Sequence, residues 1–108
     1  LIVTPEYNRS IPGVLKNTID WASRPWGENS FDGKPLAITG ATSGPIGTAV
    51  AQSDLRHIAG YLNMKLVGQP ELYFNFADKK MDESGVLIDE HKESVKAFID
   101  NFVNFIRN

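Results

Sequence analysis

Short apolar runs alternate with amphipathic segments along the 108 residues of the chain. The apolar runs lack polar alternation, as is typical of strands covered on both faces, whereas the longer segments have helical periodicity. Together they predict the order βαβαβα, with strands at 1–3, 36–39 and (interrupted) 66–74, and helices at 12–23, 51–62 and from about 89. This alternation predicts an α/β fold with a parallel sheet between helices.

The first predicted strand begins at the first residue, which is not methionine. A sheet of three strands would leave this apolar segment as a bare edge, which favours aggregation. We therefore expect a further strand to cover it, from a partner or from additional chain. The sequence is expected to be the C-terminal part of a longer polypeptide.

Composition excludes several classes of function. The net charge is −2 and lysines and arginines do not cluster, which argues against nucleic-acid or membrane-surface binding. The chain has no cysteine, so redox chemistry would require a bound cofactor. Neither His57 nor His91 has a second ligand at metal-binding spacing, so no metal site is expected.

A polar loop follows the first strand, between Pro5 and Pro12. In open α/β sheets, ligands bind beyond the carboxyl ends of strands, so this loop is a candidate site. Pro12 suits the first turn of the following helix, and Ser10 is expected to cap that helix.

A second loop, 40–47, is rich in glycine and hydroxyl groups and precedes the second helix. Small residues let backbone N–H groups approach a ligand closely, and a helix start favours negative charge. Ser43 is expected to cap this helix as well. The loop at 24–30 is a candidate wall or lid of the site. Trp21 is expected to pack against a neighbouring element, and both Trp21 and Trp26 are expected in the core or an interface.

Specific motifs add a family resemblance. The first segment reads Thr4-Pro5-Glu6-Tyr7-Asn8, then Ser10-Ile11-Pro12-Gly13, Leu15-Lys16-Asn17 and Ile19-Asp20-Trp21. The chain resembles the NADPH-dependent FMN reductases, which include quinone, azo-dye and chromate reductases. The likeness continues through Phe31-Asp32-Gly33-Lys34-Pro35, the second loop, Leu55-Arg56, Pro70-Glu71 and the segment 85–90.

The resemblance implies a flavodoxin-like three-layer α/β/α fold with parallel strand order 2-1-3-4-5. Residues 1–108 would be the C-terminal portion of one FMN-binding domain, carrying strands 3, 4 and 5. The first two βα units, which hold the FMN phosphate in this family, would be missing.

The resemblance also implies the residues that line the flavin ring: Pro5, Glu6, Tyr7, Asn8, Arg9, Thr42, Ser43 and Gly44. Asn8 and the loop backbone are expected to hydrogen-bond the ring, with Tyr7 packed beside it. Glu6 is expected to bond a loop N–H or bridge to another subunit, and Arg9 either meets the nicotinamide phosphate or lies in solvent. Many relatives continue the second loop as Gly-Gly-x-Arg, whereas this chain has 47–50 Gly-Thr-Ala-Val and lacks that guanidinium.

The implied function is an FMN-dependent NAD(P)H oxidoreductase that reduces flavin, quinone or similar small-molecule acceptors by ping-pong hydride transfer. No catalytic side chain and no metal are required. NADPH and NADH both stay open as the donor, and a cytoplasmic homodimer or homotetramer is implied. Two alternatives are a flavodoxin-like FMN electron carrier, against which the net charge of −2 argues weakly, and a non-catalytic fragment without the phosphate-binding loop.

Overall fold

The computed structural model describes residues 1–75 and 82–108. Its elements are β1 (Ile2–Thr4), α1 (Gly13–Ala22), β2 (Pro35–Leu36), β3 (Ile38–Thr42), α2 (Ala49–Tyr61), β4 (Lys65–Leu66), β5 (Tyr73–Asn75) and α3 (Asp89–Arg107). The predicted alternation is confirmed, although Ala37 divides the second predicted strand and 67–72 divides the third. The predicted polar connection 77–86 lies partly outside the described residues, and its turn at Ser84-Gly85 lies within them.

The strands are parallel, as predicted. The main sheet has the order β1-β3-β5, with Thr4 opposite Gly40 and Gly40 opposite Tyr73. β2 and β4 form a short second ladder that pairs Pro35 with Lys65. All strands therefore present their carboxyl ends at the same edge.

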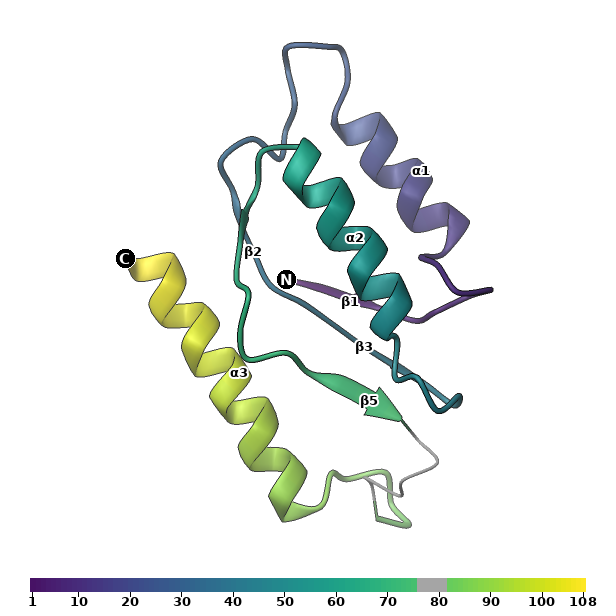
Figure 1. Ribbon diagram of the computed structural model, residues 1–108. Coiled ribbons are helices and arrows are strands. Elements are labelled where there is room, and N and C mark those ends of the chain that lie inside the picture. Colours follow the sequence, from purple (N-terminus) through teal and green to yellow (C-terminus); the bar gives the residue numbers. More distant parts are fainter. Residues whose placement is uncertain (76–81) are drawn as a thin grey trace.

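Helices cover both faces of this sheet (Figure 1). Ile38 on β3 packs with Ile19 of α1 and Leu55 of α2 in one buried cluster. Ala37, the neighbour of Ile38, packs with Phe98 of α3 in a second cluster. Successive side chains of an extended strand point to opposite faces, so these two clusters define a three-layer α/β/α arrangement.

The outer edge of β1 is bare in the described part of the chain, as expected. Only β3 pairs with β1 there. Leu1 and Val3 are 54% and 66% exposed. The strand that would cover this edge is not among the described elements.

The predicted helix caps are wrong. Pro12 occupies the cap position of α1 rather than its first turn, and no side chain caps that helix. The Ser10 hydroxyl instead donates a hydrogen bond to Asp54 Oδ2 at 2.8 Å. At α2 the cap position belongs to Thr48, because β3 continues to Thr42 and a turn then intervenes, so Ser43 is too far from the helix to cap it.

The loop at 24–30 does not lie near the predicted site. α1 runs back from the carboxyl edge of the sheet over about 15 Å, so the loop after it lies at the opposite edge (Figure 1). Trp21 and Trp26 are 75% and 77% exposed, so neither packs in the core of this chain. Within the described residues, no helix has the length and hydrophobicity that membrane crossing requires.

Candidate functional site

Two loops leave the carboxyl edge of the main sheet. They follow β1 and β3, which are paired neighbours, so both leave the sheet side by side. The strands approach closely at Gly40, where a Cβ atom would lie 2.0 Å from the Thr4 carbonyl oxygen. Glycine at this position therefore lets the two strands that carry the loops lie close together.

The first loop contains a tight turn at its tip. Tyr7 and Ser10 exchange backbone N–H···O=C bonds of 3.0 and 3.1 Å, as in a two-residue hairpin. The central residues Asn8 and Arg9 have φ of +52° and +65°, which are the left-handed conformations of a type I′ turn. Asparagine tolerates this region and arginine does so at a cost, so the chain stores strain at the tip of the candidate site.

Glu6 anchors this loop to α2. Its Oε1 accepts a 2.7 Å hydrogen bond from the Ala51 backbone N–H, and its Oε2 accepts a 3.3 Å bond from Arg9. The Glu6 side chain is only 4% exposed. A carboxylate at the positive end of a helix is favourable, and here it satisfies a donor that no local cap satisfies. The predicted contact with a backbone N–H is present, but the N–H belongs to a helix rather than to a loop.

Several donors at this edge are free. The backbone N–H groups of Asn8, Arg9 and Ser43, and the Asn8 carboxamide, make no hydrogen bond within the described part of the chain. A hollow of about 360 Å³ beside the first loop is lined by Pro5 and Tyr7 among others. The edge thus offers donors and an exposed phenol ring, which suits a planar ligand that carries acceptor atoms.

The predicted residues of the second loop lie apart from this hollow. Thr42 ends β3, and its hydroxyl accepts a 3.4 Å bond from the Gly44 N–H. Ser43 and Gly44 continue from it, and a Cβ on Gly44 would meet nothing closer than 3.9 Å. No hydrogen bond joins these three residues to the first loop in the described ranges. The described residues also hold no cluster of metal-binding side chains.

A buried polar chain supports the second loop, and sequence reasoning assigned it no role. Gln52 and Thr48 are fully buried, and Gln52 Nε2 donates to Thr48 Oγ1 at 2.9 Å and to the Leu72 carbonyl at 3.0 Å. Arg56 then donates to Gln52 Oε1 at 3.2 Å. The signal in the sequence was the i, i+4 spacing of Thr48, Gln52 and Arg56 on one side of α2.

The outer end of this chain is Tyr73. Its hydroxyl donates to Glu71 and accepts a 3.4 Å bond from Arg56, which also forms a 3.5 Å ion pair with Glu71. Burial raises the pKa of Tyr73, and the hydrogen bond to Glu71 adds to the rise while Arg56 opposes it. These contacts tie α2 to the start of β5.

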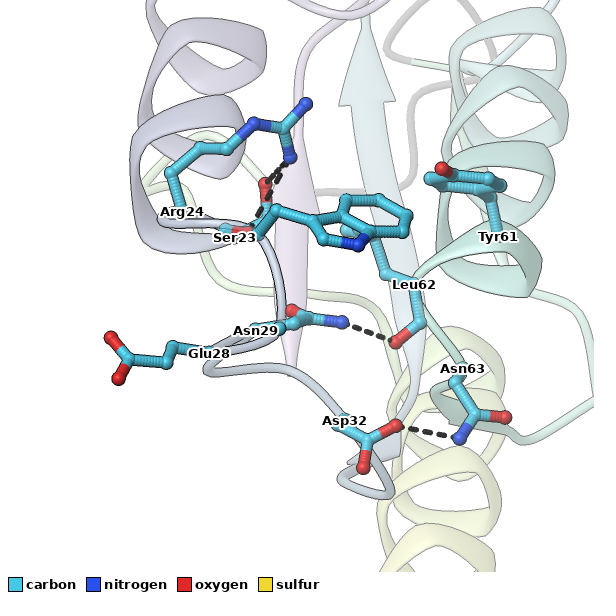
Figure 2. Close-up of a pocket in the computed structure, with 10 residues that line it drawn as sticks. Ser23, Arg24, Glu28, Asn29, Asp32, Tyr61, Leu62 and Asn63 are labelled. Carbon is cyan, nitrogen blue, oxygen red and sulfur yellow. Dashed lines mark hydrogen bonds between the residues drawn. The ribbon is translucent and has the colours of Figure 1, made fainter.

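A larger cavity lies at the other edge of the sheet (Figure 2). Its volume is about 450 Å³, and its lining includes Arg24, Trp26, Tyr61 and Asn63. Loop 23–33 and the end of α2 form its walls. It is separate from the two loops that sequence analysis singled out.

Comparison with known proteins identifies the family. The model of the NADPH-dependent FMN reductases matches residues 1–79. The chain belongs to the NADPH-dependent FMN reductase family. Both the resemblance stated from the motifs and the flavodoxin-like α/β fold are thereby confirmed.

Relatives of this FMN reductase family member include a 2-hydroxy-1,4-benzoquinone reductase of Burkholderia sp. The two sequences are 49% identical over the whole of this chain, which covers 60% of the length of that reductase. A quinone reductase of Pseudomonas putida is 40% identical over 99% of the chain, which covers 58% of that protein. Among solved structures, the chain is similar to FerB from Paracoccus denitrificans, a flavoenzyme NAD(P)H:(acceptor) oxidoreductase. The two structures align with a TM-score of 0.85 and 40% sequence identity. The alignment covers 97% of this chain and 58% of the FerB chain. The chain thus spans 58–60% of the length of these two curated relatives.

Proposed function

We propose that this protein is an FMN-dependent NAD(P)H oxidoreductase that reduces flavin, quinone or similar small-molecule acceptors by ping-pong hydride transfer. The observation that carries the proposal is the pair of loops at one sheet edge, with free backbone N–H groups at Asn8, Arg9 and Ser43. The names of the relatives, which are quinone and NAD(P)H:(acceptor) reductases, support it.

The residues proposed to hold FMN are Pro5, Glu6, Tyr7, Asn8, Arg9, Thr42, Ser43 and Gly44. When bound, FMN would supply the redox chemistry, with NADPH or NADH as the hydride donor. The chain contributes binding and orientation: N–H groups and the Asn8 carboxamide meet acceptor atoms of the ring, and Tyr7 packs beside it. The same donors would stabilise negative charge that develops on the bound group.

Glu6 has a supporting part in this proposal. Its carboxylate is occupied by Ala51 and Arg9, so it positions the loop and leaves ring contact to its neighbours. Arg9, with a side chain 64% exposed, is available to the phosphate of a nicotinamide dinucleotide.

We further propose that residues 1–108 form the C-terminal portion of a single flavodoxin-like domain, which the 60% coverage of the relatives supports. The protein is proposed to act in the cytoplasm, where NAD(P)H is available, as a homodimer or homotetramer. The exposed apolar residues Val3 and Trp21 support association with further protein.

Flavin binding is the first test. We expect FMN fluorescence to be quenched stoichiometrically on titration with the protein, and NADPH oxidation to follow when a quinone is added. FMN binding without NADPH oxidation would favour the electron carrier. Absence of FMN binding would contradict the proposal and favour a non-catalytic fragment. That alternative is also favoured by the share of the benzoquinone reductase that the chain covers, which is 60% of its length.

The Asn8→Ala variant tests the site itself. We expect it to weaken FMN binding by about 1–2 kcal/mol, the scale of a lost hydrogen bond in a partly buried site. Asn17→Ala, an exposed change on α1, is the matched control and should bind FMN as the parent does. Equal affinity of the two variants would remove Asn8 from the site.

A further inference from the structure

We propose that the cavity at the amino edge of the sheet binds a planar aromatic carboxylate, at a site distinct from the proposed flavin site. The cavity is about 450 Å³, within the range of small-molecule sites of roughly 300–1,000 Å³. It lies beyond the last turns of α1 and α2, whereas the candidate flavin loops lie before their first turns.

Two aromatic side chains give the cavity its preference for a ring. Trp26 and Tyr61 both line it and are 77% and 71% exposed. Aromatic side chains normally bury most of their large surface, so two exposed rings at one hollow leave considerable contact area without a partner. A flat aromatic ligand covers both rings and gains offset or edge-to-face stacking.

Arg24 gives the cavity its preference for an anion. Within the described part of the chain, its guanidinium makes only long bonds of 3.3 and 3.4 Å to Ser23 and has no carboxylate partner. Glu28 also lines the cavity, but Figure 2 shows its side chain pointing away from the other labelled side chains, and no ion pair joins it to Arg24 in the described part of the chain. A guanidinium has five donors in a fork that matches a carboxylate.

The rim of the cavity opposite Arg24 offers hydrogen-bond acceptors instead of donors. Asn63 Nδ2 donates to Asp32 Oδ1 at 2.6 Å, which leaves acceptor atoms on both side chains. Figure 2 places these two residues away from Arg24 across the cavity. A ligand with a carboxylate at one end of a ring and a hydroxyl donor at the other, such as a hydroxybenzoate, matches both rims.

The walls are held in place before any ligand binds. Asn29 Nδ2 donates to the Leu62 carbonyl at 2.8 Å, and the Gly33 N–H donates to the Asn63 carbonyl at 2.8 Å. These bonds join loop 23–33 to the end of α2. A preorganised cavity loses little conformational entropy on binding, which favours affinity for small ligands.

The test uses tryptophan fluorescence with 4-hydroxybenzoate as the probe. The chain has two tryptophans, so Trp21→Phe leaves Trp26 as the only reporter. We expect saturable quenching with a dissociation constant of about 1 mM or below, the scale for a ligand of this size. Flavin is absent from the titration, so the result does not depend on the proposed function.

Variants in the Trp21→Phe background assign the contacts. Arg24→Gln should weaken binding at least about tenfold, and Arg24→Lys by less because the charge is kept. Tyr61→Leu should weaken it about fivefold through lost stacking. Arg107→Gln, an exposed arginine at the end of α3, is the matched control and should bind as the parent does.

Ligand controls keep the proposal testable if Arg24→Gln does not fold, which circular dichroism would reveal. With the Trp21→Phe protein, two further ligands are compared with 4-hydroxybenzoate. Benzamide lacks the charge and cyclohexanecarboxylate lacks the aromatic ring, so each should bind at least about tenfold more weakly than 4-hydroxybenzoate. Linear quenching without saturation, equal binding of benzamide, or equal binding by a folded Arg24→Gln variant would each overturn the proposal.

Discussion

At the scale of single residues, backbone contacts decide which positions tolerate change. Gly40 lies where β1 and β3 approach, and a Cβ there would be 2.0 Å from the Thr4 carbonyl oxygen and 2.7 Å from Thr48 Oγ1. Gly60 lies near the end of α2, where a Cβ would meet nothing within 4 Å. The same substitution therefore has opposite consequences at the two sites.

Gly40→Ala is expected to lower the free energy of unfolding by about 3 kcal/mol, since the two strands must move apart. Gly60→Ala is expected to raise it by about 0.5–1 kcal/mol, because alanine loses less conformational freedom than glycine in a helix. Urea denaturation measures both. A Gly40→Ala variant as stable as the parent would mean that the strands are not in close contact.

The Tyr73 phenol is expected to ionise at a higher pH than an ordinary tyrosine. Because burial and the bond to Glu71 raise its folded-state pKa above the ordinary value of about 10, the protonated phenol stabilises the fold below about pH 10. That stability is lost as the pH rises above 10 through the folded-state pKa. The difference in 295 nm absorbance between the parent and Tyr73→Phe isolates this phenol, and a midpoint at or below 10 would contradict the expectation.

At the scale of elements, the helices lack local caps and depend on tertiary contacts. The cap position of α2 is Thr48, whose φ of +72° is left-handed and whose side chain makes no capping hydrogen bond. The missing acceptor comes from Glu6, which is far away in sequence. The start of α2 and the first candidate loop are therefore one structural unit.

Glu6→Ala should lower the free energy of unfolding by about 1–2 kcal/mol, the scale of a lost helix cap. Glu6→Gln should lose less, because an amide oxygen still accepts from Ala51. Glu28→Ala is the matched control: its exposed carboxylate has no partner in the described part of the chain, so a change within about 0.5 kcal/mol is expected. Equal stability of all three variants in thermal denaturation would show that the contact does not support α2.

At the scale of the whole molecule, the exposed edge of β1 predicts association. Val3 is 66% exposed on a strand with one free edge, and such edges pair readily with other strands. Figure 1 shows β1 next to β3 and passing behind α2, and β3 is its one pairing partner in the described part of the chain. We expect at least a dimer at micromolar concentration.

Val3→Lys places a charge on this edge and should shift the sedimentation coefficient toward that of a monomer. Val14→Lys, at a position 77% exposed on α1, is the control for added charge and should leave the edge contact intact. A monomeric parent would contradict the expected association. An equal shift in both variants would show that β1 is not the contact.

The local pattern of the sequence determined the elements and the family. Apolar residues at helical spacing, such as Ile19, Leu55 and Phe98, are buried, because the period of apolar residues dictates which face of a helix packs. The motif Pro5-Glu6-Tyr7-Asn8 after a strand also located the candidate loop at the carboxyl edge, since parallel strands all end there.

Contacts between distant residues were decided only by the tertiary structure. Ser10 and Ser43 both carry the hydroxyl group of a typical helix cap. The fold, however, places Asp54 within hydrogen-bonding reach of Ser10. Ser43 follows the end of β3 directly and is too far from the start of α2 to cap that helix. Trp26 has a large apolar side chain of the kind often found in a core, yet it lines an open cavity. The reason is that the loop containing Trp26 follows α1 and therefore lies at the other edge of the sheet. Periodicity reports which face of an element is apolar, whereas hydrogen-bond partners and cavities depend on how those faces come together.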